Sequence, residues 1–456
     1  IMHLSLSQNI SKEQFLSILS KKLLDENLSL FVGAGISIEA GYPAWQNLLA
    51  PCLKQLKLSN IKDIDLFKLA QYYVNEFGAP ALSDVISENI DRLEYKSEII
   101  EILIESKFKQ IWTTNFDKVI EKNLEKKHIR SKTIHSNYDL THINDNIVNV
   151  FKLNGDISDL QNIVITQDDI EGHEKTRELM ITFLKKALVS DTFLFLGYSF
   201  TDSLVLNCIK KIHDCLGNSM GYHYTIIKNE PDNPYFFYFI KDLEQRYHIK
   251  TLLIDEYSDI HTILRELNRR VTLKKVFISG SFDVLPEEEN QFADRLCKEL
   301  SNKILSSGYR IITGMGRKIE NYLAGHAMQY MLTNNIFNIE RYLIMRPFQE
   351  LMPSEDKFRH RNMLIEDSSS VIFIFGKSVD LKYSIGVKEE FEIAKSKKKV
   401  IIPIGSTGYQ SEIIWQEVKD NITLYPYLER YIDQLKTNKD PEIIAEIIID
   451  ILQNID

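Results

Sequence analysis

The sequence predicts an α/β fold with two Rossmann-like domains, each built on a doubly wound parallel sheet. Short apolar runs such as 28–32 and 192–196 alternate with amphipathic helical stretches. Most of these runs lead directly into glycine or polar residues, and a second series of the same kind begins near residue 274. Apolar strands that alternate with helices are typical of parallel sheets that are covered on both faces.

The first series predicts helices over 11–26, 118–126 and 174–188. Its predicted strands are 28–32, 111–114, 148–153, 192–196, 224–227 and 251–254. A chain of 456 residues has room for two or three domains.

The second series predicts strands over 275–278, 310–313, 342–345, 371–375 and 400–404. The boundary between the two series falls within a predicted helix over 259–270. We therefore predict one domain over 1–268 and another over 269–456.

The composition favours a soluble globular protein and argues against some partners. Hydrophobic residues make up 44% and charged residues 26%, and the formal net charge is -9. This acidic balance argues against nucleic acid or an acidic membrane surface as the main partner. No apolar stretch approaches the roughly 18 to 20 residues that span a bilayer, and no signal peptide is recognised. We expect a cytoplasmic protein.

The cysteines predict neither a metal site nor a disulfide framework. Cys52, Cys208, Cys215 and Cys297 include no C-x-x-C pair, which zinc ribbons require. We expect all four to be buried free thiols and no metal to be bound.

The turn Gly33-Ala34-Gly35 follows the first predicted strand. Ligands of open α/β sheets bind at the carboxyl ends of the strands, and glycines there let the backbone approach a pyrophosphate closely. A G-x-G string alone is equally consistent with a tight turn that binds nothing. The polar residues that follow the other strands favour a ligand.

These polar residues form an ordered series, and in combination they resemble the sirtuin family over about residues 25–260. The matching segments are 33–37, 41–43, 113–117, 152–156 and 197–199. The resemblance implies that NAD is the bound dinucleotide and that Asn115 and Asp117 contact its nicotinamide ribose and amide. The implied NAD-binding set is Gly33, Ala34, Gly35, Ser37, Asp117, Gly197 and Ser199. A helix-capping role for Asn115 and Asp117 is the alternative.

Two departures argue against a protein deacylase. Sirtuin deacylases carry a zinc module with paired cysteines, which this chain lacks. Their proline loop continues Asp-Phe-Arg, whereas Pro43 is followed here by Ala44-Trp45-Gln46. Both departures fit sirtuin-like proteins that cleave NAD itself.

Asn154 is a third departure, and it affects the catalytic set Asn115 and Asn154. The family has a histidine at this position, where it acts as a general base. An amide has no titratable nitrogen, and losing a positioned base costs about 10² to 10⁴ in rate. Asn154 fits either an engineered substitution that traps ligand or a natural non-catalytic relative.

The second half carries basic residues beside glycine turns, a pattern that suits a phosphorylated nucleotide. It resembles the SLOG superfamily, although the P-G-G string of the enzymatic members is absent, which favours a sensor over a nucleoside-phosphate hydrolase. Solvated surface charge is the alternative for Arg359, Arg361 and Lys377. The predicted messenger-binding residues are Ser279, Gly280, Ser281, Gly314, Met315, Gly316, Arg346, Arg359, Arg361, Lys377, Gly386 and Glu390.

A sirtuin-like domain followed by a SLOG domain resembles the NAD-degrading effectors of Thoeris anti-phage defence. The resemblance implies NAD as substrate and a cyclic ADP-ribose isomer as activator, made by a TIR-domain partner protein. It also implies a homotetramer or filament. Two alternatives remain: a non-catalytic sensor of NAD or ADP-ribose, and an NAD-dependent deacylase.

Overall fold

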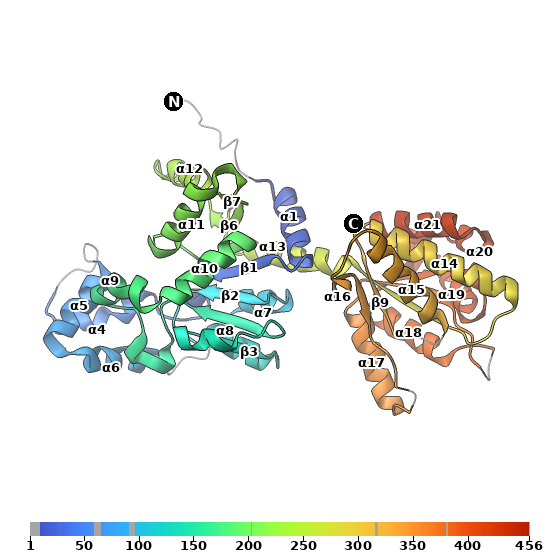
Figure 1. The fold of residues 1–456 in the computed structure, drawn as a ribbon, viewed down its shortest axis with the longest axis horizontal. Helices are drawn as coiled ribbons and strands as arrows, with labels where there is room; N and C mark the ends of the chain where they lie inside the picture. Colours follow the sequence, from blue (N-terminus) through green and yellow to red (C-terminus); the bar gives the residue numbers. More distant parts are fainter. Residues whose placement is uncertain are drawn as a thin grey trace. The chain divides into compact units, whose positions relative to one another are not determined.

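The computed structural model describes residues 10–58, 65–90, 96–201, 203–314, 318–349, 351–379 and 382–455. The chain divides into two compact units, Ile1–Asn268 and Arg269–Asp456. Each unit has its own sheet, and every strand pair in both sheets is parallel (Figure 1). The predicted fold class, two Rossmann-like domains with parallel sheets, is confirmed.

Unit 1 contains a seven-stranded sheet in the order β3-β4-β2-β1-β5-β6-β7. Its strands are β1 (Leu28–Val32), β2 (Gln110–Thr113), β3 (Ser131–Ile134), β4 (Val148–Lys152), β5 (Thr192–Leu196), β6 (His223–Lys228) and β7 (Ile249–Ile254). Strands β2, β4 and β3 extend from one side of β1, and β5, β6 and β7 extend from the other. The strand order therefore reverses between β1 and β5, which is where ligands bind in open α/β sheets.

Most helices of unit 1 cover this sheet. They are α1 (Lys12–Leu24), α2 (Ala34–Glu39), α7 (Glu98–Glu105), α8 (Val119–Lys126), α10 (Glu178–Ser190), α11 (Ser203–Leu216), α12 (Phe236–Tyr247) and α13 (Asp259–Leu273), whose last residues belong to unit 2. A smaller group, α3 (Trp45–Leu48), α4 (Ala50–Gln55), α5 (Leu66–Phe77) and α6 (Ala79–Ile90), packs around its own apolar core, which includes Leu48, Leu69 and Ile86. In Figure 1 this group lies together at one end of the unit. Helix α9 (Gln167–Thr176) packs against α10 and against α5 of the smaller group.

Unit 2 contains a five-stranded sheet in the order β10-β9-β8-β11-β12. Its strands are β8 (Lys275–Ser281), β9 (Arg310–Thr313), β10 (Leu343–Met345), β11 (Ser370–Phe375) and β12 (Val400–Pro403). Its helices are α14 (Glu287–Ser306), α15 (Lys318–Thr333), α16 (Ile339–Tyr342), α17 (Ser354–Glu366), α18 (Ile385–Ser396), α19 (Tyr409–Asp420), α20 (Gln434–Thr437) and α21 (Pro441–Gln453). The strand order reverses between β8 and β11, so unit 2 has a switch point of the same kind.

Two local expectations from the sequence are wrong, and one strand was not predicted. The predicted helix 174–188 is two helices that meet at Arg177, whose φ of -126° and ψ of 29° are not helical. The Arg177 side chain is buried and bonds to two backbone carbonyls, so tertiary contacts prevail over the helical pattern. Strand β3 was not predicted because its residues Ser-Lys-Thr-Ile are mostly polar and only Ile134 is buried. Cys215 is exposed, whereas the other three cysteines are buried.

Candidate functional site

The glycine turn of unit 1 lies at the switch point between β1 and β5. The Gly33 amide donates to the Leu196 carbonyl at 2.8 Å, and the Gly35 amide donates to the Gly197 carbonyl at 2.9 Å. A Cβ atom on Gly33 would lie 2.3 Å from the Gly197 oxygen. The two turns pack backbone against backbone, and only glycine fits at position 33.

Asn115 connects this turn to the end of β2. Its amide nitrogen Nδ2 donates to the Gly33 carbonyl at 3.0 Å and to the Ser37 hydroxyl at 2.9 Å. Its backbone amide donates to the Thr113 hydroxyl at 2.9 Å, which fixes the turn after the strand. The Asn115 side chain is therefore held in place by its own neighbours.

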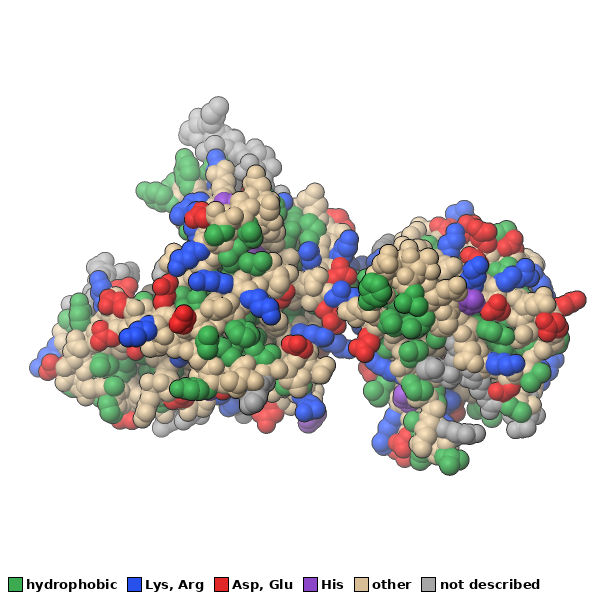
Figure 2. Space-filling view, viewed as in Figure 1, with side chains coloured by type: hydrophobic (Ala, Val, Ile, Leu, Met, Phe, Trp, Pro, Cys, Tyr) green, Lys and Arg blue, Asp and Glu red, His purple; other side chains and the backbone are tan. Residues whose placement is uncertain are grey.

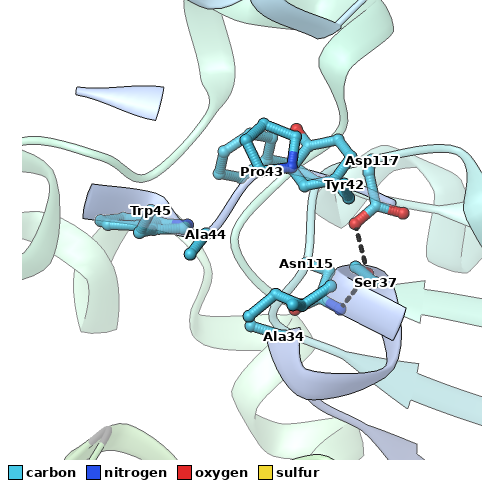
Figure 3. A pocket seen from close by; sticks show the side chains of 10 residues that line it. Ala34, Ser37, Tyr42, Pro43, Ala44, Trp45, Asn115 and Asp117 are labelled. Atoms are coloured by element: carbon cyan, nitrogen blue, oxygen red, sulfur yellow. Dashed lines mark hydrogen bonds between the residues drawn. The ribbon is translucent and has the colours of Figure 1, made fainter. Parts of the chain in front are cut away.

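Ser37 forms hydrogen bonds to both Asn115 and Asp117. Its hydroxyl accepts from Asn115 and donates to Asp117 Oδ2 at 2.7 Å, and Asp117 Oδ1 accepts from the Val119 amide at 2.9 Å. Asp117 is only 4% exposed. Burial raises its pKa, although the Lys152 ammonium and the Ser37 hydroxyl oppose that rise. Asn115, Ser37 and Asp117 thus form one hydrogen-bonded chain (Figure 3).

A pocket of about 270 Å³, its open mouth included, lies against this chain. Its lining residues are Ala34, Ser37, Ile38, Tyr42, Pro43, Ala44, Trp45, Asn115, Phe116 and Asp117. Trp45 and Ala44 lie across the pocket from Ser37 and Asp117 (Figure 3). The Trp45 ring is held by Phe67 at 5.0 Å between ring centroids and by Phe116 at 6.0 Å. One wall is therefore aromatic and the opposite wall polar.

This aromatic wall was not predicted from the sequence, in which Pro43-Ala44-Trp45 stood out only as a departure from a family pattern. The signal available in the sequence was an aromatic residue soon after a glycine. Its ring partners come from distant elements, since Phe67 is on α5 and Phe116 is in the turn after β2. Their packing was not foreseeable from spacing alone.

Asn154 follows β4 at the same end of the sheet. It is 5% exposed, and its carbonyl accepts from the Val164 amide at 2.8 Å. Gly155 next to it has a φ of +89°, a conformation that glycine adopts readily. Asn154 is not among the residues that line the pocket. Ser199 is also outside the pocket lining, and its hydroxyl contacts the Thr201 hydroxyl at 2.7 Å.

Charged side chains are buried beneath these turns. Lys152 is 1% exposed, and its ammonium contacts Glu121 at 3.0 Å, Asp156 at 2.7 Å and the Asp117 carbonyl. Lys118 pairs with the other oxygen of Asp156 at 2.7 Å. Burial raises the pKa of Asp156, but the Lys152 and Lys118 ammonium groups outweigh it and hold this pKa well below its usual range. Lys152 and Asp156 belong to a motif recognised in the sequence, but their pairing was not predicted.

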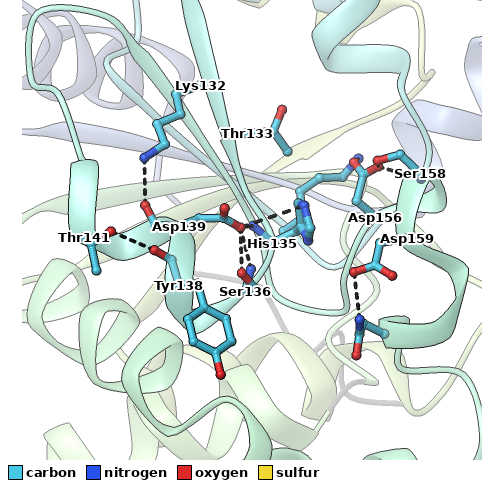
Figure 4. Close-up of polar contacts among 12 residues, drawn as sticks. Lys132, Thr133, His135, Ser136, Tyr138, Asp139, Thr141, Asp156, Ser158 and Asp159 are labelled. Carbon is cyan, nitrogen blue, oxygen red and sulfur yellow. Dashed lines mark hydrogen bonds and ion pairs between the residues drawn. The ribbon is translucent and has the colours of Figure 1, made fainter.

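A second polar group lies after β3 (Figure 4). Asp139 accepts from the Ser136 hydroxyl at 2.8 Å, and His135 Nε2 is 3.8 Å from the same oxygen. On α9, His173 Nε2 donates to the Leu153 carbonyl at 3.1 Å. Burial lowers the His173 pKa, so its imidazole is held in the neutral form. His173 therefore fixes the residue that precedes Asn154.

In unit 2 several predicted residues meet around α18 and the end of β8. The Ser279 hydroxyl donates to Glu390 at 2.6 Å, and Arg361 contacts Glu389 at 2.7 Å and Glu390 at 3.5 Å. A Cβ atom on Gly386 would lie 2.7 Å from an Arg361 nitrogen. Burial raises the pKa of Glu390, which Ser279 and Arg361 partly offset.

Other predicted residues adjoin this cluster. A Cβ atom on Gly280 would lie 2.6 Å from the Ile374 carbonyl, and Ser281 accepts from the Gly376 and Lys377 amides. Lys377 Nζ donates to the Val284 carbonyl at 2.8 Å. The turns after β8 and β11 therefore meet at the switch point of unit 2.

Gly314 and Arg346 approach from the other side of β8. Phe348 packs over Gly314 and lies 5.1 Å from the Arg361 guanidinium. Arg346 pairs with Asp367, and its carbonyl accepts from His360 at 3.0 Å. Met315 and Gly316 lie outside the described residues.

Arg359 differs from Arg361 although both are on α17. Its side chain is 69% exposed and pairs with Glu355 at 2.6 Å on the same helix. The Arg361 side chain is 15% exposed. The structure therefore brings Arg361 to the cluster and leaves Arg359 on the surface.

Among the described residues, no group of three or more histidine, cysteine and acidic side chains is placed to hold a metal. No helix in the described part of the chain has the length and apolar character that a membrane crossing requires. On the face shown in Figure 2, basic and acidic side chains are interspersed within each unit.

The fold and these sites define a protein with two Rossmann-like domains, of which the first is sirtuin-like. Residues 109–252 match the SIR2-like domain family. Residues 259–455 match the Sir2- and TIR-associating SLOG family. The two matches fall in units 1 and 2, apart from the α13 residues before 269.

The chain belongs to the family of proteins named NAD(+) hydrolase ThsA. It is 32% identical to the one from Cytobacillus dafuensis, over 91% of this chain and 90% of that one. It is 29% identical to that of Bacillus cereus (strain MSX-D12), over 97% of each chain. Identity to the Enterococcus faecium protein is 31%, over 91% of this chain and 92% of that one.

Proposed function

We propose that unit 1 binds NAD and that its fold is built to hydrolyse the bond between nicotinamide and ribose. The observation that carries this proposal is the chain Asn115–Ser37–Asp117, which lies directly against Gly33 and one wall of the pocket. The ThsA relatives are named as NAD(+) hydrolases, which supports the same activity here.

The pocket suits one end of a dinucleotide. It is lined on one side by the Trp45 ring and on the other by Ser37, Asn115 and Asp117, and such sites typically combine apolar walls with a few polar groups. We place the nicotinamide and its ribose there, between Trp45 and the polar wall. Asn115 orients the ribose and a water molecule, and Asp117 holds the nicotinamide amide.

We propose that the pyrophosphate binds beside the glycine turn, where glycine lets this turn pack closely against the turn after β5. The amides of Gly33 and Gly35 already donate to the turn after β5, so they are not free donors. Glycine allows the two turns to approach closely because it has no side chain to obstruct them. Gly197 of the β5 turn makes the same close contact from the other side.

Hydrolysis converts NAD⁺ and water into ADP-ribose, nicotinamide and a proton. As the glycosidic bond breaks, its electron pair goes to the nicotinamide ring, and water bonds to the ribose carbon. A base must accept the proton from that water or from a ribose hydroxyl. Asn154 cannot accept it, because an amide is not basic. We therefore propose that this chain binds NAD but turns it over slowly.

We propose that unit 2 binds a cyclic ADP-ribose isomer and that binding activates unit 1. Such a ligand carries a diphosphate, which guanidinium groups recognise well. Within the described part of the chain, Arg346 Nη1 is buried without a hydrogen-bond partner, which leaves a cationic donor for an anion. Arg361 and Lys377 add positive charge beside glycine turns. Ribose hydroxyls can donate to Glu390.

The biological setting follows from the same proposal. We propose that a TIR-domain partner makes the activator and that NAD depletion serves anti-phage defence. The matched family's description as TIR-associating supports this setting. A homotetramer or filament is the assembly that we propose.

The test is to restore the base with Asn154→His. Purified Asn154→His protein with cyclic ADP-ribose isomers should consume NAD about 10² to 10⁴ times faster than the parent. NAD, ADP-ribose and nicotinamide are measured by chromatography. The matched control is Asn154→His combined with Asn115→Ala, which should be inactive. If Asn154→His leaves NAD intact with every isomer, the hydrolase proposal is wrong.

Asn154 itself favours a second candidate, a sensor that binds NAD or ADP-ribose without chemistry. A sensor should bind NAD as tightly before and after the Asn154→His change and never release nicotinamide. The same chromatography therefore separates the two functions.

A further inference from the structure

We propose that Lys152 is a positioning residue that joins the two turns on which NAD cleavage depends. One turn carries Asn115 and Asp117, and the other carries residue 154. The inference rests on the proposed NAD hydrolysis. It assigns Lys152 no contact with substrate.

The Lys152 ammonium has three partners on different parts of unit 1. It contacts the Asp117 carbonyl in the first turn, Glu121 on α8 at 3.0 Å and Asp156 at 2.7 Å. An ammonium has three N–H donors, so all of its donors are used. The side chain of the last residue of β4 thus links the turn after β2 to the turn after β4, in addition to the Lys118–Asp156 pair and the hydrogen bond from the Ile157 amide to the Phe116 carbonyl.

Burying these charges costs desolvation free energy, so the arrangement is a poor way to gain stability alone. Lys152 is 1% exposed, and the Asp156 side chain is fully buried. Buried ion pairs are often no more stabilising than apolar residues of similar volume. An apolar residue could fill this space in the core, but it could not bond to the Asp117 carbonyl. The directional contact is therefore what distinguishes lysine here.

The second turn is fixed on its other flank as well. Asp156 is held by Lys118 at 2.7 Å, and it accepts from the Ser158 amide at 2.8 Å (Figure 4). His173 holds the Leu153 carbonyl, and the Val164 amide holds the Asn154 carbonyl. Hydrogen bonds therefore hold the backbone on both sides of residue 154, and Lys152 positions this residue relative to Asp117.

Catalysis is sensitive to such placement. A displacement of about 1 Å caused by a remote substitution can cost about 10²-fold in rate. We expect Lys152→Met to let the two turns move apart while the glycine turn and its contacts with Gly197 stay in place. The nicotinamide end of NAD should then bind less well, whereas the ADP-ribose part should keep its contacts with the protein.

The experiment uses full-length protein in two backgrounds. In Asn154→His protein with activator, Lys152→Met should lower kcat about 10²-fold and raise KM at most about 5-fold. In the parent chain, calorimetry should show about 5-fold weaker binding of carba-NAD, a stable NAD analogue, and ADP-ribose binding within about 2-fold.

Two variants separate positioning from stability. Lys152→Met with Glu121→Gln removes one charge of each sign and leaves the Lys118–Asp156 pair, so its stability should recover relative to Lys152→Met. Its kcat should not recover. Leu184→Ala, at a fully buried site on α10, should cost about 2–5 kcal/mol and leave kcat nearly unchanged.

The pH dependence is an additional readout. The Lys152 charge lowers the Asp117 pKa, so its removal should move the acidic limb of the kcat profile to higher pH. The proposal is overturned if kcat recovers with stability in the double variant, or if carba-NAD and ADP-ribose lose affinity equally. If the Asn154→His parent is inactive, the hydrolase proposal fails, and the carba-NAD comparison still decides the role of Lys152.

Discussion

The sites of units 1 and 2 lie at the same kind of switch point but are built differently. In unit 1, Asn115, Ser37 and Asp117 bond to one another in a chain that exists before any ligand arrives. In unit 2, Arg361 pairs with Glu389 and Glu390, so its charge is already engaged. The first site is preorganised, whereas Arg361 in the second must exchange its ion pairs to contact an anion.

This difference suits the two proposed roles. Preorganised polar groups lower the cost of reaching a transition state, because no partner has to be broken first. A site that exchanges partners couples binding to a change in protein conformation, since the displaced carboxylates must find a new environment. A ligand activates only if it favours one conformation over another. We infer that unit 1 is built for chemistry and unit 2 for switching.

Among substitutions in the unit 1 site, we expect Gly33→Ala to cause the largest loss of stability and NAD affinity. The new Cβ atom would lie 2.3 Å from the Gly197 oxygen and 2.5 Å from the Tyr198 Cα, both backbone atoms. Overpacking against backbone should cost at least about 3 kcal/mol and lower NAD affinity by more than about 100-fold. Urea unfolding and calorimetry measure the two losses.

Gly172→Ala is the matched control, because a Cβ atom there meets nothing within 4 Å. Gly172 is inside α9, where alanine should stabilise by about 0.5–1 kcal/mol. Unchanged NAD binding in Gly33→Ala protein would refute the role given to this turn.

The next effect tests the ion pairs of unit 2. Arg361→Ala should weaken binding of the cyclic ADP-ribose activator by about 10- to 100-fold, because charged hydrogen bonds are worth about 1.5–3 kcal/mol. Arg359→Ala should change it by less than about 3-fold, since its exposed pair with Glu355 is worth little. Calorimetry with both variants measures the contrast. Equal losses would mean that α17 presents both guanidinium groups to the ligand.

The contrast between Arg359 and Arg361 shows where sequence reasoning stops. The predicted messenger set includes both, because basic residues near a strand suggest phosphate binding. On a helix, however, two residues apart means a rotation of about 200°, so one side chain can face the sheet while the other faces solvent. Without the facing elements, the sequence gives no way to choose between them.

The same limit applies in unit 1. Apolar strands such as Leu28–Val32 were predictable, because burial on both faces demands a continuous apolar run. The positions of the glycine turn, Asn115 and Asp117 after strands were also predictable, and the structure has them there. Lys152 was not assigned a role, because its partners Asp117 and Glu121 are 35 and 31 residues away in sequence. Only the packed fold shows that these groups meet.

The smallest effect is the change with pH in the stability contributions of Asp156 and Glu390, which should have opposite signs. Asp156 has a folded pKa below its unfolded value, because its lysine partners outweigh the effect of burial. Its contribution to stability is therefore present above about pH 4 and is lost as pH falls below that. Glu390 has a folded pKa above its unfolded value, because it is buried. The folded state then binds more protons than the unfolded state, so stability falls as pH rises above about 4.5.

Asp156→Asn and Glu390→Gln test these signs in one experiment. Asp156→Asn should cost unit 1 about 3 kcal/mol at pH 7 and clearly less at pH 3.5, because it breaks a buried ion pair. Glu390→Gln mimics the protonated acid, so unit 2 should tolerate it better at pH 7 than at pH 5. Urea unfolding read by pulsed hydrogen exchange follows the peptides of each unit separately. The stability costs of the two substitutions should therefore change with pH in opposite directions. If both costs fell as pH rose, or both fell as pH dropped, the contrast between a stabilising ion network in unit 1 and a destabilising buried acid in unit 2 would be wrong.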